Sequence, residues 1–203
     1  MLKASAQRKA TRTRILDAAF STLREEGFGG ASARAIARRG GFNQALVFYH
    51  FGSVNGLLLA ALDRVAGERM ERYRELLSDV RDPAEVIRRM RLLYEEDRES
   101  GHSTVLAEMF AASSAAPELR EQLMLRMGPW IDFTTGLLTD FFAGTPLEHL
   151  VDARTTAQAF LAAYIGIDVL SHLDRDGGRA AAIFDAGDRL AAFAGAFLGG
   201  DRT

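Results

Sequence analysis

Residues 43–50, Asn-Gln-Ala-Leu-Val-Phe-Tyr-His, bring together side chains that can read DNA bases, and none of them is a carboxylate. The amide of Gln44 can donate to and accept from adenine, and the guanidinium of Arg34 can make the corresponding paired contact with guanine. Ala45 and Leu46 have the size and polarity to touch thymine methyl groups. These residue types indicate readout of base edges in the major groove.

A second group of side chains is suited to phosphate. Tyr49 and His50 carry polar tips that can meet phosphate oxygens. Ser32 and Asn43 stand at the starts of two expected helices, where side-chain and backbone groups can hold a phosphate. Both residues are equally suited to capping those helices, and His50 can instead close the turn into the next helix. These alternatives remain open from the sequence.

Short helices must position these residues. Ser32 starts one that Gly40-Gly41 stops, and the next covers 44–50, which together make a helix-turn-helix with a reading helix for the major groove. A longer helix over about 7–26 precedes them and ends at Gly27. Phe48 and Phe51 are expected to pack inside this assembly.

Charge is divided unevenly along the 203 residues. Residues 1–52 hold nine Lys or Arg against three Asp or Glu, for a net charge of +6, whereas the remainder carries −8. A basic head on an acidic body favours contact of the head alone with a polyanion. Cysteine is absent, no apolar run reaches the ~18 residues of a membrane span, and no secretory signal is evident, so we expect a cytoplasmic protein without disulfides or membrane association.

The rest of the chain shows helical spacing and almost no strand signal, which predicts an all-α fold. Asp82-Pro83-Ala84-Glu85 has the pattern of a helix start, with a capping acid and proline at the first position. Further helices are expected over about 53–77, 83–98, 103–115, 117–142, 152–174 and 179–198. The predicted domains are a DNA-binding head (1–52), the start of a connecting helix (53–66) and a body (67–203).

The last two predicted helices are rich in small residues, which let helices approach closely. They are Ala159, Ala162, Ala163 and Gly166 in the first helix, and Ala182, Ala186, Ala191, Gly195 and Gly199 in the second. This pattern fits either packing within one chain or a homodimer interface. A dimer is favoured because a small reader needs a partner to reach two half-sites ~34–36 Å apart.

Several blocks in the head stand in a characteristic order: Ile15-Leu16-Asp17-Ala18-Ala19-Phe20, Gly27-Phe28, Ser32-Ala33-Arg34-Ala35-Ile36-Ala37, Gly41, and Val47-Phe48-Tyr49-His50-Phe51 followed by Leu57. With these blocks, segment 12–62 resembles the DNA-binding domain of the TetR (tetracycline repressor) family of transcriptional regulators. The resemblance implies a dimeric regulator, most often a repressor, that binds a near-palindromic operator in double-stranded DNA and is released by a small-molecule effector.

Two positions depart from the family pattern. Phe48 stands where a tyrosine is usual, and Val54-Asn55 stand where a lysine is usual, so two phosphate contacts are missing. A basic arm is expected to compensate, and DNA binding should therefore depend strongly on salt. The arm consists of Lys3, Arg8, Lys9, Arg12 and Arg14.

The body carries large soft side chains that fit either an ordinary core or an apolar effector cavity between helices. The candidate ligand contacts are Met109, Phe110, Met127, Trp130, Phe133, Tyr94, Tyr164 and, as a polar contact, Asp168. The sequence offers no catalytic constellation, metal site or cofactor motif, so we expect a regulator and not an enzyme. The alternatives are a helical-bundle enzyme or ligand carrier with a non-functional head, and a structural DNA-binding protein without sequence preference.

Overall fold

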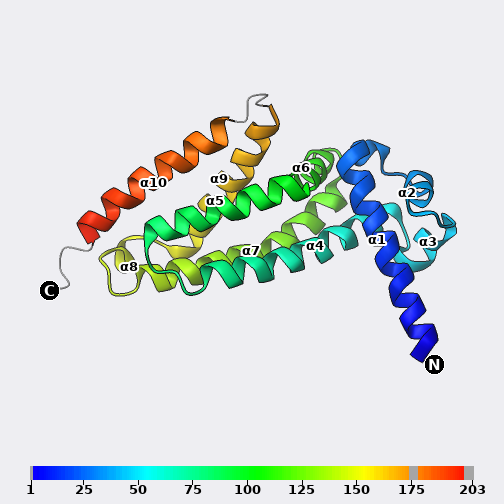
Figure 1. Cartoon of the computed structure of the whole chain (residues 1–203), viewed down its shortest axis with the longest axis horizontal. Coiled ribbons are helices and arrows are strands. Elements are labelled where there is room, and N and C mark those ends of the chain that lie inside the picture. The colour runs from blue at the N-terminus through cyan, green and yellow to red at the C-terminus, as the bar shows by residue number, and fades with distance from the viewer. Residues whose placement is uncertain (1, 174–177, 199–203) are drawn as a thin grey trace. The chain divides into compact units, whose positions relative to one another are not determined.

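The computed structural model describes residues 2–173 and 178–198 (Figure 1). All regular elements in these residues are helices, which confirms the predicted all-α class. In chain order they are α1 (Leu2–Gly30), α2 (Ala33–Gly40), α3 (Ala45–Phe51), α4 (Val54–Leu77), α5 (Pro83–Ser100), α6 (His102–Ser113), α7 (Pro117–Phe142), α8 (Leu147–Leu150), α9 (Ala153–Leu173) and α10 (Gly178–Leu198).

The chain forms two compact units. The first comprises Met1–Glu68 and Gly101–Met124, and the second comprises Arg69–Ser100 and Leu125–Thr203. Two of the three divisions fall inside α4 and α7, so each of these helices contributes to both units, and the third falls between α5 and α6. The first unit thus takes in α6 and the start of α7, in addition to the segment expected to form the head.

The first unit is built around a core that α1, α2, α3, α4, α6 and α7 share. Ile15, Ile36, Val47 and Leu57 are fully buried in it, and residues of α6 and α7 complete the cluster. Gly41 makes the sharp turn between α2 and α3 with φ of 64°, a conformation that glycine adopts without steric cost. The core thereby holds the two short helices in the expected helix-turn-helix arrangement.

The end of α1 is fastened to α6. Gly27 interrupts the helix with φ of 69° and ψ of 177°, at the position where the sequence predicted its end. Directly after it, the backbone N–H of Phe28 donates to Oε2 of Glu108 at 2.9 Å. This contact between residues 80 positions apart ties the amino-terminal helix to α6 within the first unit.

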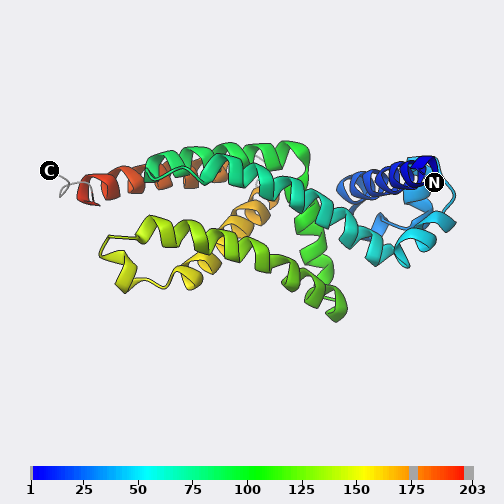
Figure 2. The same ribbon diagram turned by 90° about the horizontal axis from the view of Figure 1, so that it is seen from below.

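In the second unit α5 and α10 lie side by side, as both views show (Figures 1 and 2). Their contact buries Phe184, which packs against Tyr94, and Arg91 of α5 pairs with Asp185 and Asp188 of α10. A second cluster centres on Tyr73, Leu77 and Leu93 and receives Trp130 and Phe133 from α7.

Most predicted helix boundaries are confirmed. Asp82 accepts from the backbone N–H groups of Ala84 and Glu85, as its capping role required, and α7 runs from Pro117 to Phe142 as expected. The four-residue α8 was not predicted. Among the helices that the structure describes, no single one could span a membrane; α3 and α4 reach the required hydropathy only together, across a bend of 65°.

Candidate DNA-binding surface and effector pocket

The outward side of α3 is formed by Gln44, Ala45, Phe48 and Tyr49. Phe48 is 52% exposed and Tyr49 is 69% exposed, and Gln44 and Ala45 are exposed as well. Val47 is fully buried. The helical repeat of 3.6 residues explains this division, since positions 44, 45, 48 and 49 share one side of the helix. We call these four residues the α3 face.

Two expectations about α3 are reversed. Phe48, expected inside the head, is exposed, whereas Leu46, expected to touch bases, is half-buried against the core of the first unit. Phe51 packs against that core as predicted. The helical repeat explains both reversals. Leu46 and Phe51 lie on the buried side of α3 with Val47, whereas Phe48, the residue after Val47, points away from the core.

Arginines of α1 flank α3. The guanidinium of Arg8 donates to the hydroxyl of Tyr49 at 3.5 Å, and Arg12 lies 5.1 Å from the centroid of the Phe51 ring. Arg14 lies 5.8 Å from the ring of Phe42, in the turn before α3. These contacts keep part of the predicted basic arm beside the α3 face, where it adds positive charge.

Ser32 caps α2 as one alternative expected, whereas Asn43 lies one residue before Gln44, the N-cap of α3, and bonds to the first turn. The Ser32 hydroxyl accepts from the backbone N–H of Ala35 at 3.2 Å, and Oδ1 of Asn43 accepts from that of Ala45 at 2.9 Å. Arg34 is exposed on α2. His50 is half-buried, with its ring edge-to-face against Tyr49 at 4.9 Å.

At the C-terminal end of α2 lies a network of ion pairs that was not predicted from the sequence. Arg39 binds Glu25 at 2.6 Å and Glu26 at 3.1 Å, and Arg38 lies 3.8 Å from Glu26. Hydrogen bonds from Arg39, and then from Arg24, lower the pKa of the Glu25 carboxyl. Arg39 thus already has two carboxylate partners from α1.

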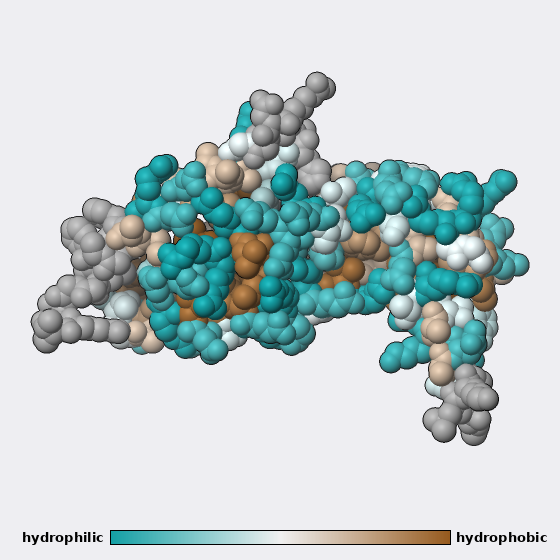
Figure 3. Space-filling model, in the orientation of Figure 1, coloured by the Kyte–Doolittle hydropathy of each residue, from teal (hydrophilic) through white to brown (hydrophobic). Residues whose placement is uncertain are grey.

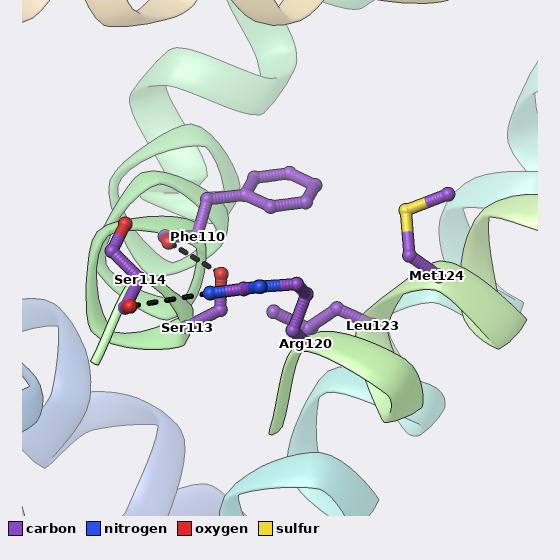
Figure 4. Close-up of a pocket in the computed structure, with 6 residues that line it drawn as sticks. All are labelled: Phe110, Ser113, Ser114, Arg120, Leu123 and Met124. Carbon is purple, nitrogen blue, oxygen red and sulfur yellow. Dashed lines mark hydrogen bonds between the residues drawn. The ribbon is translucent and has the colours of Figure 1, made fainter. Parts of the chain in front are cut away.

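A pocket of about 400 Å³ opens between the end of α6 and the start of α7, within the first unit. Figure 4 shows the ring of Phe110 above the Arg120 guanidinium, which donates to the backbone carbonyl of Ser114 at 3.2 Å. The other lining residues are Ser113, Leu123 and Met124. Its volume lies in the range of small-molecule sites. Of the predicted ligand contacts, only Phe110 lines it.

The second unit contains a buried polar cluster that the sequence did not reveal. The hydroxyls of Tyr73 and Tyr164 lie 2.8 and 2.7 Å from Oδ2 of Asp97 and 2.9 Å from each other. Arg69 forms an ion pair with the same aspartate. Burial raises the pKa of both phenols, so they remain protonated donors. This cluster links α4, α5 and α9.

Other predicted ligand contacts also have partners inside the protein. Tyr94 donates to the Ser171 hydroxyl at 2.9 Å, and Trp130 packs edge-to-face on Tyr73 at 5.2 Å. Phe133 joins the same cluster as Trp130. Met109 and Met127 are buried, Met109 in the core of the first unit. The side chain of Asp168 lies outside the described residues.

Helices α9 and α10 expose apolar side chains. Phe160 and Leu170 of α9 and Ile183 and Leu190 of α10 are all at least 42% exposed, Leu190 reaching 70%. Most of the predicted small residues accompany them: Ala159, Ala162, Ala163 and Ala182 are exposed, Gly166 and Ala186 half-exposed, and Ala191 buried. Gly195 and Gly199 lie outside the residues whose side chains are described. In the space-filling view, apolar surface also shows in recesses between hydrophilic side chains (Figure 3).

Comparison with known proteins matches the geometry of the head. Residues 15–61 fit the model of the bacterial regulatory proteins of the tetR family. An HTH-type transcriptional regulator of Mycobacterium tuberculosis is 23% identical over 124 residues, which are 61% of this chain and 64% of that relative. The chain thus aligns with just under two thirds of the relative's length. The HTH-type transcriptional repressor NicS of Pseudomonas putida is 29% identical over 84 residues, 41% of this chain and 40% of NicS.

The first part of the chain, residues 15–61, therefore matches the DNA-binding domain of the tetR family. The fold of the chain agrees: the transcriptional regulator FadR from Bacillus subtilis, solved in complex with stearoyl-CoA, superposes with a TM-score of 0.75 over 88% of this chain and 96% of FadR, at 15% identity. Where the family pattern has a lysine, this chain has Val54, which packs on the core, and the exposed Asn55. Positive charge near the α3 face comes from Arg8 and Arg12 of α1.

Proposed function

We propose that this chain is a DNA-binding transcriptional repressor of the TetR type. It reads a near-palindromic operator in double-stranded DNA and acts without catalysing a reaction, in the cytoplasm where that DNA lies. The observation that carries the proposal is the α3 face. Exposed base-reading side chains occupy the second helix of a helix-turn-helix, and arginines of α1 flank them.

The predicted contacts have defined roles in this proposal. Gln44 and Ala45 meet base edges from α3, and Arg34 reaches guanine from α2. Tyr49 meets phosphate, with the guanidinium of Arg8 beside its hydroxyl to strengthen the interaction. Ser32, Asn43 and His50 lie at helix ends, where phosphate contacts position the reading helix.

A direct test selects bound sequences from a random duplex library and measures the affinity for the selected duplex at several salt concentrations. The proposal expects an inverted repeat and a linear fall of log affinity with log salt. Retention of DNA without any selected sequence would instead support a structural DNA-binding protein. No retention at low salt would support a ligand carrier or enzyme with a non-functional head.

The proposed effector is a small, mostly apolar molecule. The pocket between α6 and α7 supports it with apolar walls of Phe110, Leu123 and Met124 and one cation, Arg120. The binding of an acyl-CoA by FadR is a property of that protein, and it agrees with an apolar ligand here. Since α6 also holds the end of α1 through Glu108, a ligand that prefers a shifted α6 would alter the head. Mass spectrometry of molecules that co-purify with the native protein tests for such a ligand.

The proposed assembly is a homodimer formed through α9 and α10. The small and apolar side chains that these helices expose, including Phe160 and Leu190, are unusual for a surface that stays in water. A twofold pairing of α9 and α10 would cover them in both subunits. Sedimentation analysis of the full chain tests for this dimer.

A further inference from the structure

We infer that Phe48 is a specificity-determining residue that, together with Ala45, reads the 5-methyl groups of thymine in the operator. This inference rests on the proposed DNA-binding function and assigns a base-reading role to a side chain that the sequence placed in the core. Leu46, which the sequence favoured for methyl contacts, is half-buried and packed on the core.

Phe48 is exposed on α3. Among the described residues of the first unit, the exposed large apolar side chains are Phe48, Tyr49 and Met124. Met124 lines the α6–α7 pocket, whereas Phe48 and Tyr49 are neighbours on α3. Phe48 is 52% exposed, whereas the other phenylalanines of this unit are at least partly buried. An aromatic ring placed this way is suited to an apolar partner from outside the chain.

The chemistry of the neighbouring residues identifies that partner. Ala45 precedes Phe48 by three residues, so their side chains are adjacent on one side of the helix. The α3 face carries the Gln44 amide but no carboxylate and no ammonium, and the nearby guanidiniums of Arg8 and Arg12 attract phosphate. In the major groove the apolar feature that a base pair presents is the thymine methyl group, for which alanine and phenylalanine are suitable contacts.

Phe48 and Tyr49 consequently have separate tasks. The Tyr49 hydroxyl accepts a hydrogen bond from Arg8, which directs its polar end toward the basic flank and the phosphates. Phe48 has no polar atom, so it gains from a methyl group and gains nothing from a phosphate oxygen. Each half-site is expected to contain one or two thymines whose methyl groups matter, next to the adenine that Gln44 reads.

The test starts from the operator selected from a random library. Each thymine in turn is replaced by deoxyuridine, which removes the methyl group and leaves base pairing and O4 unchanged. The full-length wild-type protein is expected to lose affinity about four-fold at one or two positions per half-site, the value for a buried methyl-sized group. Thymines outside the contact serve as internal controls.

The same duplexes are then titrated with two variants. Phe48→Ala is expected to bind the thymine operator at least about four-fold more weakly and to lose its response to deoxyuridine. Phe48→Tyr, which keeps the ring, is expected to retain that response. Because Phe48 is exposed, both variants should fold, and the deoxyuridine series on the wild-type protein requires no substitution at all.

Specific operator binding with no loss at any deoxyuridine would overturn the inference and leave the proposed function intact. A Phe48→Ala protein that responds to deoxyuridine as the wild type does would also overturn it. Failure to select any sequence would overturn the inference and the proposed function together.

Discussion

Glu108 of α6 accepts a hydrogen bond at 2.9 Å from the backbone N–H of Phe28, directly after the break in α1. A Cβ on Gly27 would come within 2.9 Å of the same carboxylate, so a side chain at that position would push Glu108 aside. The positive φ of Gly27 adds to this restriction. Glu108 and Gly27 together define how α1 ends against α6.

Replacing Glu108 with alanine should destabilise the first unit. The partly buried N–H of Phe28 would lose its acceptor, which costs about 1–3 kcal/mol in the free energy of unfolding. Urea denaturation followed by circular dichroism measures the change. Glu108→Gln keeps an acceptor oxygen and should recover most of the loss. Equal stability of the alanine variant and the wild type would contradict this role.

Arg34 and Arg39 lie on the same short helix and should differ in their effect on DNA binding. Arg39 is held by Glu25 and Glu26, whereas Arg34 is exposed and is proposed to contact a base. Arg34→Ala should weaken operator binding by about 1–3 kcal/mol, and Arg39→Ala should change it by less than about 0.5 kcal/mol. Fluorescence anisotropy on the selected operator compares them. An equal loss in both variants would refute the distinction.

Asp97 should be among the most sensitive positions of the second unit. Its carboxylate accepts hydrogen bonds from the hydroxyls of Tyr73 and Tyr164 and forms an ion pair with Arg69. Asp97→Ala would therefore leave the largely buried guanidinium of Arg69 without this partner. The expected destabilisation is about 3–5 kcal/mol. Thermal denaturation is the measurement. Asp132→Ala, which removes an exposed ion pair with Arg154, is the matched control and should cost at most about 1 kcal/mol.

The pH dependence of stability should include a contribution from Glu96. A hydrogen bond from Arg72 lowers the pKa of this carboxyl below the 4.5 of an unperturbed glutamate. The unfolded chain then binds more protons than the folded one, so stability is full above pH 4.5 and is lost as the pH falls through the lowered pKa.

Glu96→Gln provides the comparison for this effect. At pH 7 the free energy of unfolding of the wild type should exceed that of the variant by at most about 1 kcal/mol, because the ion pair of Glu96 with Arg72 is partly exposed. This difference should vanish at low pH. Melting curves of both proteins between pH 7 and pH 3 measure it. A difference that stays constant over this range would rule out titration of Glu96 as its cause.

The proposed dimer predicts opposite outcomes at two exposed leucines. Leu190 of α10 is 70% exposed and Leu150 of α8 is 78% exposed. Leu190→Glu would bury an unpaired charge in the α9–α10 interface and should weaken the dimer at least about 100-fold. Leu150→Glu should leave the dimer intact. Sedimentation velocity distinguishes these cases, and a Leu190→Glu protein that dimerises normally would argue against this interface.

The sequence predicted the helices well because their signals are local. Asp82-Pro83 and Pro117 start helices through capping and backbone geometry, and Gly41 ends one through its positive φ. It was harder to predict which side chains of α3 point inward and which point outward. In this helix of seven residues, Leu46 and Phe48 lie on either side of the buried Val47, and hydrophobicity alone favours burial of both.

Contacts between distant segments could not be predicted from one sequence. Asp97 stands in the run Glu95-Glu96-Asp97-Arg98-Glu99, which has the composition of a solvated helix surface, and only the packing of α4 and α9 shows that it is buried. The same applies to Arg39, whose carboxylate partners precede it by 13 and 14 residues. A ligand-lining role was predicted for Tyr164, whose hydroxyl instead lies against Asp97.

The α3 helix carries no arginine or lysine, and the arginines that contact its side chains, Arg8 and Arg12, belong to α1. Base recognition and attraction to phosphate, which many DNA-binding proteins combine in one helix, are therefore assigned to different helices in the proposed function. Under the proposed function, substitutions at Gln44, Ala45 or Phe48 should change the preferred operator while the salt dependence of binding stays the same. Substitutions at Arg8 or Arg12 should change the affinity for any duplex without changing the preferred sequence. Affinity and sequence specificity could then be engineered independently.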